Sequence, residues 1–125
     1  MSSSAMEINS TNWQDYLFER LELDFDNIKI HLNDESDRNI KMVAEGYIGI
    51  SYVGHWDESV VQSIKVEKGT ILTEKALTII KNNYGDMVAG GGYRKLEDEW
   101  NELVIEFIDN IQLSIVCRDV TVCAE

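Results

Sequence analysis

The chain has 125 residues, enough for one domain and too few for two ordinary ones. It carries 11 lysines and arginines against 23 aspartates and glutamates, which gives a net charge of −12. Such an acidic surface repels phosphate backbones and anionic lipid headgroups, which argues against nucleic acid and membranes as direct partners. The hydrophobic fraction of 44% is enough for a core, so the composition predicts a folded domain.

The two ends of the chain and its cysteines bear on where the protein works. Residues 1–5 resemble an expression remnant that precedes a native start at Met6. The predicted domain therefore spans residues 6–125. We see no signal peptide and no apolar run near the roughly 20 residues of a membrane span, and we expect a cytoplasmic protein. The spacing of Cys117 and Cys123 fits no metal or redox motif, which predicts two free thiols.

The first predicted element is a short helix over residues 11–20. Thr11 and Gln14 have the spacing of a capping box. Apolar residues four positions apart then share one helical face: Trp13, Leu17 and Leu21. The alternative is a strand that begins early, at Tyr16.

Alternating apolar and polar residues next predict a β-hairpin within residues 21–32. Its turn falls at Asp26 and Asn27, because both residue types tolerate positive φ. His31 has the polar parity of its strand, so we expect its side chain to be exposed. A polar loop follows at residues 33–39.

The middle of the chain predicts a long strand and the clearest helix. Residues 40–53 are rich in β-branched and aromatic side chains and indicate one long or broken strand, with bends or bulges at Gly46 and Gly49. The helix spans residues 73–84, with Thr73 as its cap. Its expected buried stripe contains Ala76, Leu77, Ile80 and Tyr84.

Three further strands complete the prediction. One lies at residues 60–66, and two form a hairpin, at residues 103–108 and 111–117, about Asp109 and Asn110. The parity of the apolar residues changes after Cys117, which predicts a bulge or a turn near Arg118 and Asp119. Together these elements predict an α+β fold, a mainly antiparallel β-sheet with one or two helices packed on one face.

The segment at residues 54–58 is the richest in chemically versatile side chains, but it matches no catalytic motif. His55 beside Asp57 and Glu58 has the groups of a general base or a metal ligand. No nucleophile motif or phosphate-binding glycine pattern accompanies it, and no metal or cofactor site is expected. The alternatives are a loop in which Trp56 fills the core, or a loop that contacts a partner.

The strongest charge feature is an acidic run around Trp100. It contains Glu97, Asp98, Glu99 and Glu102, continues to Glu106, and has no basic residue within it. Such a run is usually a solvated face. The aromatic residue among carboxylates also suits the binding of a basic protein, because the ring anchors the contact and the acids steer and pair with arginines.

Two stretches carry a resemblance to a known class of protein. They are the Gly-His-Trp-Asp-Glu segment at residues 54–58 with Val60 and Val61, and the stretch WNELVIEFID at residues 100–109. In these two stretches the chain resembles small bacterial immunity proteins of polymorphic or contact-dependent toxin systems. It also resembles them in its short length, its acidity and its lack of proline. The resemblance implies occlusion of a cognate toxin, often a basic nuclease, and no chemistry of its own.

The sequence therefore favours a non-enzymatic binding protein that neutralises a basic partner. The expected contacts are residues 55–58, residues 97–99, Trp100 and Glu102, and binding should be fast and salt-sensitive. Two alternatives stay open: a phage-type inhibitor that mimics nucleic acid against a host enzyme, and a ligand-binding or enzymatic domain that uses His55. Pairing of edge strands between copies, giving a homodimer, is also left open.

Overall fold

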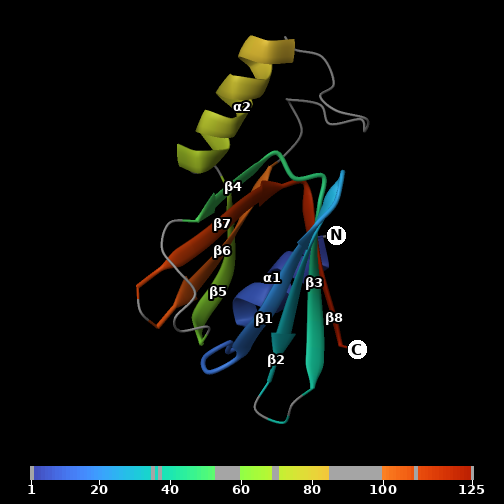
Figure 1. Cartoon of the computed structure of the whole chain (residues 1–125), viewed down its shortest axis with the longest axis vertical. Helices are drawn as coiled ribbons and strands as arrows, with labels where there is room; N and C mark the ends of the chain where they lie inside the picture. Colours follow the sequence, from blue (N-terminus) through green and yellow to red (C-terminus); the bar gives the residue numbers. More distant parts are fainter. Residues whose placement is uncertain are drawn as a thin grey trace.

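The computed structural model describes residues 2–34, 36, 38–52, 60–68, 71–84, 100–108 and 110–124. Within these residues the chain forms two helices and eight strands (Figure 1). In chain order they are α1 (Ser2–Ser10), β1 (Leu17–Leu23), β2 (Asn27–Asn33), β3 (Asn39–Glu45), β4 (Gly49–Tyr52), β5 (Val61–Lys68), α2 (Ile71–Tyr84), β6 (Asn101–Phe107), β7 (Gln112–Cys117) and β8 (Asp119–Ala124).

The strands form two antiparallel sheets that face each other across one core (Figure 1). Sheet A has the strand order β1-β2-β3-β8, and sheet B has the order β4-β7-β6-β5. Because β3 continues into β4 and β7 into β8, one long strand pair passes from sheet A into sheet B. The predicted α+β class, mainly antiparallel sheet with two helices, is confirmed.

The predicted bend at Gly46 and the predicted bulge or turn near Arg118 are confirmed, whereas Gly49 is the first residue of β4, pairs regularly with Val116 and shows no bend. Gly46 has a φ of +64°, and a Cβ added there would lie 3.1 Å from the side chain of Arg118. Glycine adopts this left-handed conformation without steric cost. Arg118 interrupts the opposite strand, so that Cys117 and Val120 both reach the core. The bend and the bulge together form the corner between the sheets.

Both predicted hairpins are present, but they close differently. In the first, the Asp24 carboxylate accepts hydrogen bonds from the backbone N–H groups of Asp26 (2.9 Å) and Asn27 (2.7 Å). These bonds lower the pKa of Asp24. Neither Asp26 nor Asn27 has the positive φ that we expected, because the side chain makes the turn instead. In the second hairpin Asn110 does adopt a φ of 69°.

The predicted helix at residues 11–20 is wrong, and the alternative of an early strand is close to the structure. The helix lies earlier, at Ser2–Ser10, and β1 begins at Leu17. The Thr11 hydroxyl donates to the carbonyl of Glu7 (2.7 Å), so it closes a helix and does not begin one. The indole N–H of Trp13 donates to the carbonyl of Ile8 (2.9 Å), which folds the chain back onto α1.

Helix α1 covers the open side between the two sheets, where it contacts β5 and β8 (Figure 1). The Asn9 side chain donates to the carbonyl of Val66 (3.2 Å) and accepts from its N–H (2.7 Å), as a neighbouring strand would. Further along β5, Val61 exchanges backbone hydrogen bonds with Asp15 and Tyr16. These contacts occupy the outer edge of β5, which protects it from pairing with another chain.

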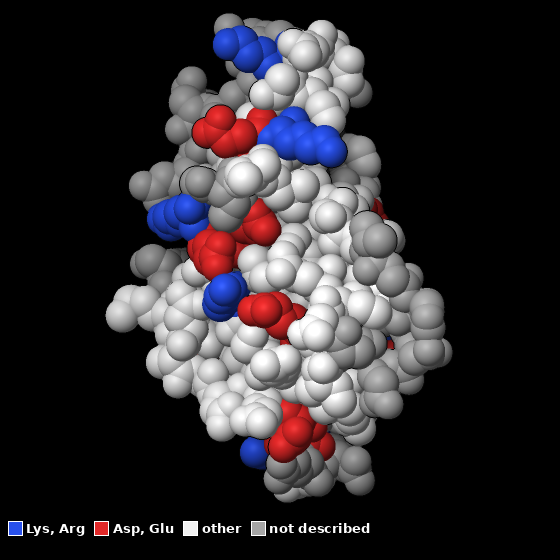
Figure 2. Space-filling model, turned by 90° about the vertical axis from the view of Figure 1, so that its left-hand side faces the viewer, with Lys and Arg blue, Asp and Glu red and all other residues white. Residues whose placement is uncertain are grey.

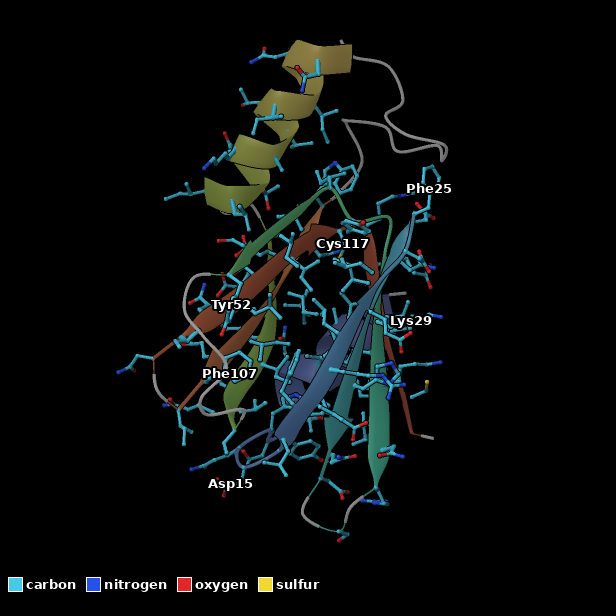
Figure 3. The ribbon with its side chains drawn as sticks, in the orientation of Figure 1. Asp15, Phe25, Lys29, Tyr52, Phe107 and Cys117 are labelled. Atoms are coloured by element: carbon cyan, nitrogen blue, oxygen red, sulfur yellow. The ribbon has the colours of Figure 1, made fainter. Side chains whose placement is uncertain are left out.

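The core lies between the sheets, and its buried residues come from every strand except β4, which contributes the half-buried Tyr52. Figure 3 shows Phe107 near the lower end of this space and Cys117 near its upper end. The rings of Phe18 and Phe107 meet edge to face, with centroids 5.7 Å apart and planes at 74°, and so join sheet A to sheet B. The largest fully buried side chains are Phe107, Ile8, Ile28, Ile30, Leu32, Met42, Leu103, Ile105, Leu113, Ile115, Val61 and Val116.

The second helix is confirmed, with a different start. Helix α2 begins at Ile71, so Thr73 lies inside its first turn, where it is buried, and does not cap the helix as expected. Of the predicted stripe, Ala76 is buried and Leu77 and Ile80 are half-buried, while the side chain of Tyr84 is not among those described. A Cβ added at Gly49 would lie only 3.2 Å from the Ala76 Cβ atom, so this glycine allows the helix to rest directly on β4.

Candidate functional site

The structure describes two of the nine predicted partner contacts. Residues 55–58 and 97–99 lie outside the described residues. Trp100 and Glu102, at the beginning of β6, are each 5% exposed. The indole nitrogen of Trp100 is buried and has no hydrogen-bond partner among the described residues. In this structure neither side chain is therefore open to a partner.

The register of sheet B places the remaining polar side chains of this region on one surface. Alternate residues of a strand point to opposite faces, so the partners that lie opposite one another form rows across the outer face. The first row contains Gly49, Val116, Glu102 and Glu67. The second contains Ser51, Ser114, Val104 and Lys65, and the third Gln112, Glu106 and Ser63.

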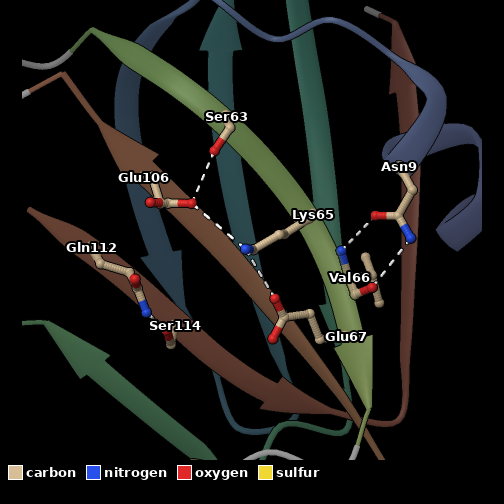
Figure 4. A network of polar contacts seen from close by, with 8 residues as sticks. All are labelled: Asn9, Ser63, Lys65, Val66, Glu67, Glu106, Gln112 and Ser114. Atoms are coloured by element: carbon tan, nitrogen blue, oxygen red, sulfur yellow. Dashed lines mark hydrogen bonds and ion pairs between the residues drawn. The ribbon is translucent and has the colours of Figure 1, made fainter. Parts of the chain in front are cut away.

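A compact ionic network lies where β5 and β6 run together (Figure 4). The ammonium of Lys65 lies 3.0 Å from a carboxylate oxygen of Glu67 and 3.7 Å from one of Glu106. The hydroxyl of Ser63 donates to the same Glu106 oxygen at 3.1 Å. Glu67 raises the pKa of Lys65 most strongly, and Glu106 adds a smaller increase. Two carboxylates thus share one ammonium, and the network keeps one negative charge.

We call Ser63, Lys65, Glu67 and Glu106 the β5–β6 strip. The three charged side chains are between 41% and 48% exposed, so a partner can reach them. Figure 2 shows the side of the molecule formed by sheet B and α2, where acidic and basic side chains follow one another down the face. Uncharged side chains occupy most of the remaining surface. The described face is therefore only locally acidic.

Helix α2 adds a second, smaller apolar layer on the same face of sheet B. Four of the described buried hydrophobic residues lie outside the main core cluster: Ala76, Trp100, Val104 and Val116. Val104 and Val116 belong to the outward-facing rows of the sheet, and Ala76 lies over Gly49. This layer explains why β6 and β7 have buried residues on both faces.

A half-open groove of about 230 Å³ runs between α2 and β4. Its walls are mostly aliphatic, and two of the lining side chains are strongly exposed, Ile50 at 41% and Ile79 at 50%. Among the described residues of the lining, Lys75 carries the one charge. The groove is lined by Ile48, Gly49, Ile50, Ser51, Leu72, Lys75, Ala76, Ile79 and Ile80.

His31 on sheet A is the described histidine, and it is not exposed as expected but buried, at 9% exposure. Arg20 and Lys41 lie opposite it on the neighbouring strands. Its Nε2 atom is 2.6 Å from a carboxylate oxygen of Glu22. Arg20 lowers the pKa of Glu22 most strongly, and His31 lowers it further. These contacts tie β1 to β2.

The described residues contain no group of three or more histidines, cysteines, aspartates or glutamates placed to hold a metal ion. Neither described helix is long and apolar enough to cross a membrane. Both cysteines are free thiols: Cys117 is buried in the core and Cys123 is exposed on β8. Burial raises the pKa of Cys117 to about 12, and the nearby carboxylates of Asp119 and Glu45 add to this effect.

The two thiols should react at very different rates. The thiolate is the reactive form, and at pH 8 it is almost absent at buried Cys117. We expect 5,5′-dithiobis(2-nitrobenzoate) to modify Cys123 rapidly and Cys117 only after unfolding, so the reagent titrates one thiol per native chain and two in denaturant. The Cys123→Ser variant should show no rapid phase. Rapid modification of Cys117 in that variant would contradict its placement in the core.

Comparison with protein-family models, with curated proteins and with solved structures finds no match.

The sequence pattern predicted the β6 residue of the β5–β6 strip but not its three β5 residues. Glu106 ends the acidic run that drew attention to Trp100. Ser63, Lys65 and Glu67 were missed, although their alternation along β5 already places them on one face. The pairing of β5 with β6 could not be read from a local pattern, because these strands are about 40 residues apart in the chain.

Proposed function

We propose that this protein is a non-enzymatic binding module that neutralises a basic protein, as a cytoplasmic immunity protein inhibits a nuclease-type toxin. The net charge of −12 supports a basic partner, because it steers such a partner toward the molecule over a distance. Within the described part of the chain no group of three or more residues is placed to hold a metal ion, and the raised pKa of Cys117 makes that thiol a poor nucleophile. Binding is therefore the activity that its chemistry supports best.

The observation that carries the proposal is the β5–β6 strip. Its two carboxylates are held in place, Glu106 by Ser63 and both by Lys65, so docking a guanidinium there costs little side-chain ordering. Lys65 satisfies only part of their charge, and each carboxylate oxygen accepts more than one hydrogen bond. An arginine of the partner can therefore add to the network without displacing Lys65.

The basic domain of the protein encoded directly upstream in the source genome is the partner to test. We expect it to be toxic, to bind this chain in a one-to-one complex, and to lose its activity on binding. Cytochrome c, a basic protein of unrelated function, serves as the non-cognate reference and should bind only weakly and only at low salt. An upstream product that neither binds nor is inhibited contradicts the proposal.

Neutralising the strip should slow association. For the double variant Glu67→Gln and Glu106→Gln we expect an association rate about ten-fold lower at low salt, with a weaker salt dependence, as for charges at the rim of an interface. Glutamine keeps the hydrogen bond to Ser63. Stopped-flow fluorescence at several salt concentrations measures both effects.

The matched control is the double variant Glu19→Gln and Glu45→Gln on sheet A. It removes the same total charge from exposed positions on the opposite side of the molecule. At 0.15 M salt the Debye length is about 8 Å, so charges on sheet A are largely screened from a partner on sheet B. Equal slowing by both double variants would show that the electrostatic field of the whole protein steers the partner. It would also show that the β5–β6 strip is not the contact surface.

A further inference from the structure

Strand β1 forms one edge of sheet A (Figure 1). At its start, Leu17 forms an isolated bridge with Val60. From Arg20 to Leu23, no strand among the described residues pairs with the outer side of β1. The outer edge of β5, by contrast, is occupied by Asn9. An unpaired edge is a template for a further strand, so β1 can accept one from another chain.

The backbone of β1 directs its free hydrogen-bonding groups outward at alternate residues. Where the hairpin closes, the N–H of Asp24 donates to the carbonyl of Asn27 (3.0 Å). Bonded positions alternate along an antiparallel pair, so Glu22, two residues earlier, bonds inward to β2. The N–H and C=O groups of Leu21 and Leu23 therefore point away from β2, toward the open edge.

The charged side chains of β1 make this edge selective. Arg20 and Glu22 lie on the outer face of sheet A, opposite His31 and Lys29 of β2. They are 58% and 49% exposed, and the Arg20 Nε atom lies 3.2 Å from a carboxylate oxygen of Glu22. Charges on an edge strand block pairing with most other strands. This edge suits a strand that places an acid opposite Arg20 and a base opposite Glu22.

A second copy of β1 meets this requirement in one antiparallel register. Directly opposed residues share a face, so a two-fold axis between identical strands passes through one residue. With Leu21 on the axis, Arg20 of each copy lies opposite Glu22 of the other. An axis at Arg20 or at Glu22 places like charges on the axis, and an axis at Leu23 places Glu22 opposite Asp24.

We propose that the chain forms a symmetric homodimer by antiparallel pairing of β1 with β1 of a second copy, with Leu21 on the two-fold axis. The two copies of sheet A then join into one sheet of eight strands. Leu21 exchanges backbone hydrogen bonds with its counterpart. Two arginines and two glutamates, Arg20 and Glu22 of each copy, form a cluster of alternating charge on the outer face.

The dimer is weak and leaves the β5–β6 strip accessible. The bulge between Phe18 and Arg20 ends the regular pairing, so the contact is short. Contacts that bury less than about 1,200 Å² are typical of transient complexes. The strip belongs to sheet B, so the dimer stands or falls independently of the proposed inhibition.

Sedimentation velocity measures the self-association. At about 0.3 M salt the Debye length is below about 8 Å, so long-range repulsion between two copies of net charge −12 is largely screened. Under these conditions we expect a monomer–dimer equilibrium with a Kd of the order of 0.1 mM. Because the interaction saturates at two copies, no larger species should form.

Charge reversal tests this register specifically. Arg20→Glu places an acid opposite Glu22, and Glu22→Arg places a base opposite Arg20, so each variant alone should weaken self-association at least ten-fold. An equimolar mixture of the two variants should form a heterodimer, because every facing pair then has opposite charges. Circular dichroism checks that both variants fold, as expected for substitutions at exposed positions.

Lys65 and Glu67 on β5 provide matched control variants. They form an exposed ion pair with the same spacing along the strand, on the other sheet. Lys65→Glu and Glu67→Lys change the net charge by the same amounts as the two β1 variants. Each should self-associate as the unchanged chain does, so a general effect of net charge is separated from the contact at β1.

Amide hydrogen exchange tests the backbone contact. As the protein concentration rises, exchange of the Leu21 N–H should slow, while that of Glu22, which already bonds to β2, should not change. The proposal is overturned if the unchanged chain is monomeric at about 1 mM. It is also overturned if either β1 variant dimerises as well as the unchanged chain, if mixing the two variants restores no dimer, or if Leu21 gains no protection.

Discussion

Replacing Ile8 with alanine is expected to lower the free energy of unfolding by about 2–4 kcal/mol. Ile8 is completely buried, although it belongs to a short helix near the start of the chain. Its side chain fills the core at the open side between the two sheets, where α1 meets β5 and β8. Alanine favours helix formation, so the loss comes from the cavity and not from a weaker helix.

Urea unfolding followed by tryptophan fluorescence measures this loss. Met6→Ala is the control in the same helix, because Met6 is 72% exposed and its truncation should change stability by less than about 0.5 kcal/mol. If Ile8→Ala is as mild as Met6→Ala, α1 does not seal the core in solution. In that case the edge of β5 that Asn9 covers would also be open to pairing with another strand.

Most of the sheet follows from local patterns. Ile28 and Ile30 alternate with polar residues, and this alternation alone predicts both the strand and its buried face. The bend at Gly46 is equally local, since it depends on the φ of one residue. The change of parity at Arg118 predicts the corner in β7 and β8 for the same reason.

The errors arise where distant contacts override a local pattern. Trp13, Leu17 and Leu21 have helical spacing, but Trp13 bonds back to Ile8, and Leu17 begins a strand that pairs with β2. The helix forms instead in a serine-rich stretch of weak propensity, because burial of Ile8 stabilises it. A single-sequence reading cannot weigh such tertiary contacts.

The same limit applies to the candidate site. A run of acids around Trp100 predicts an exposed anchor, yet the pairing of β6 between β5 and β7 places Trp100 and Glu102 in a buried layer. His31 has the polar parity that predicts exposure, but the long side chains of the neighbouring strands flank it. In both cases the face of the strand follows from local parity, while the burial depends on neighbours distant in sequence.

Replacing Phe107 with alanine is expected to be the most damaging single truncation, with a loss of about 3–5 kcal/mol. Phe107 is 1% exposed at the end of β6, and its ring meets that of Phe18 from the opposite sheet. Domains of this size are stable by about 5–15 kcal/mol, so the variant could be largely unfolded at 37 °C. Thermal unfolding followed by circular dichroism gives the shift in midpoint.

A double-mutant cycle with Phe18→Ala separates the ring contact from general burial. An edge-to-face pair contributes about 0.5–1.5 kcal/mol beyond its buried area, so the double variant should be less destabilised than the two single losses added together. Phe107→Leu, which retains most of the volume, keeps the cycle measurable if alanine unfolds the chain. Ile108→Ala is the neighbouring control, because Ile108 is 48% exposed and should cost little. Exact additivity of the Phe18 and Phe107 losses would mean that the two sheets are joined by burial alone and that the aromatic pair adds no specific contact between them.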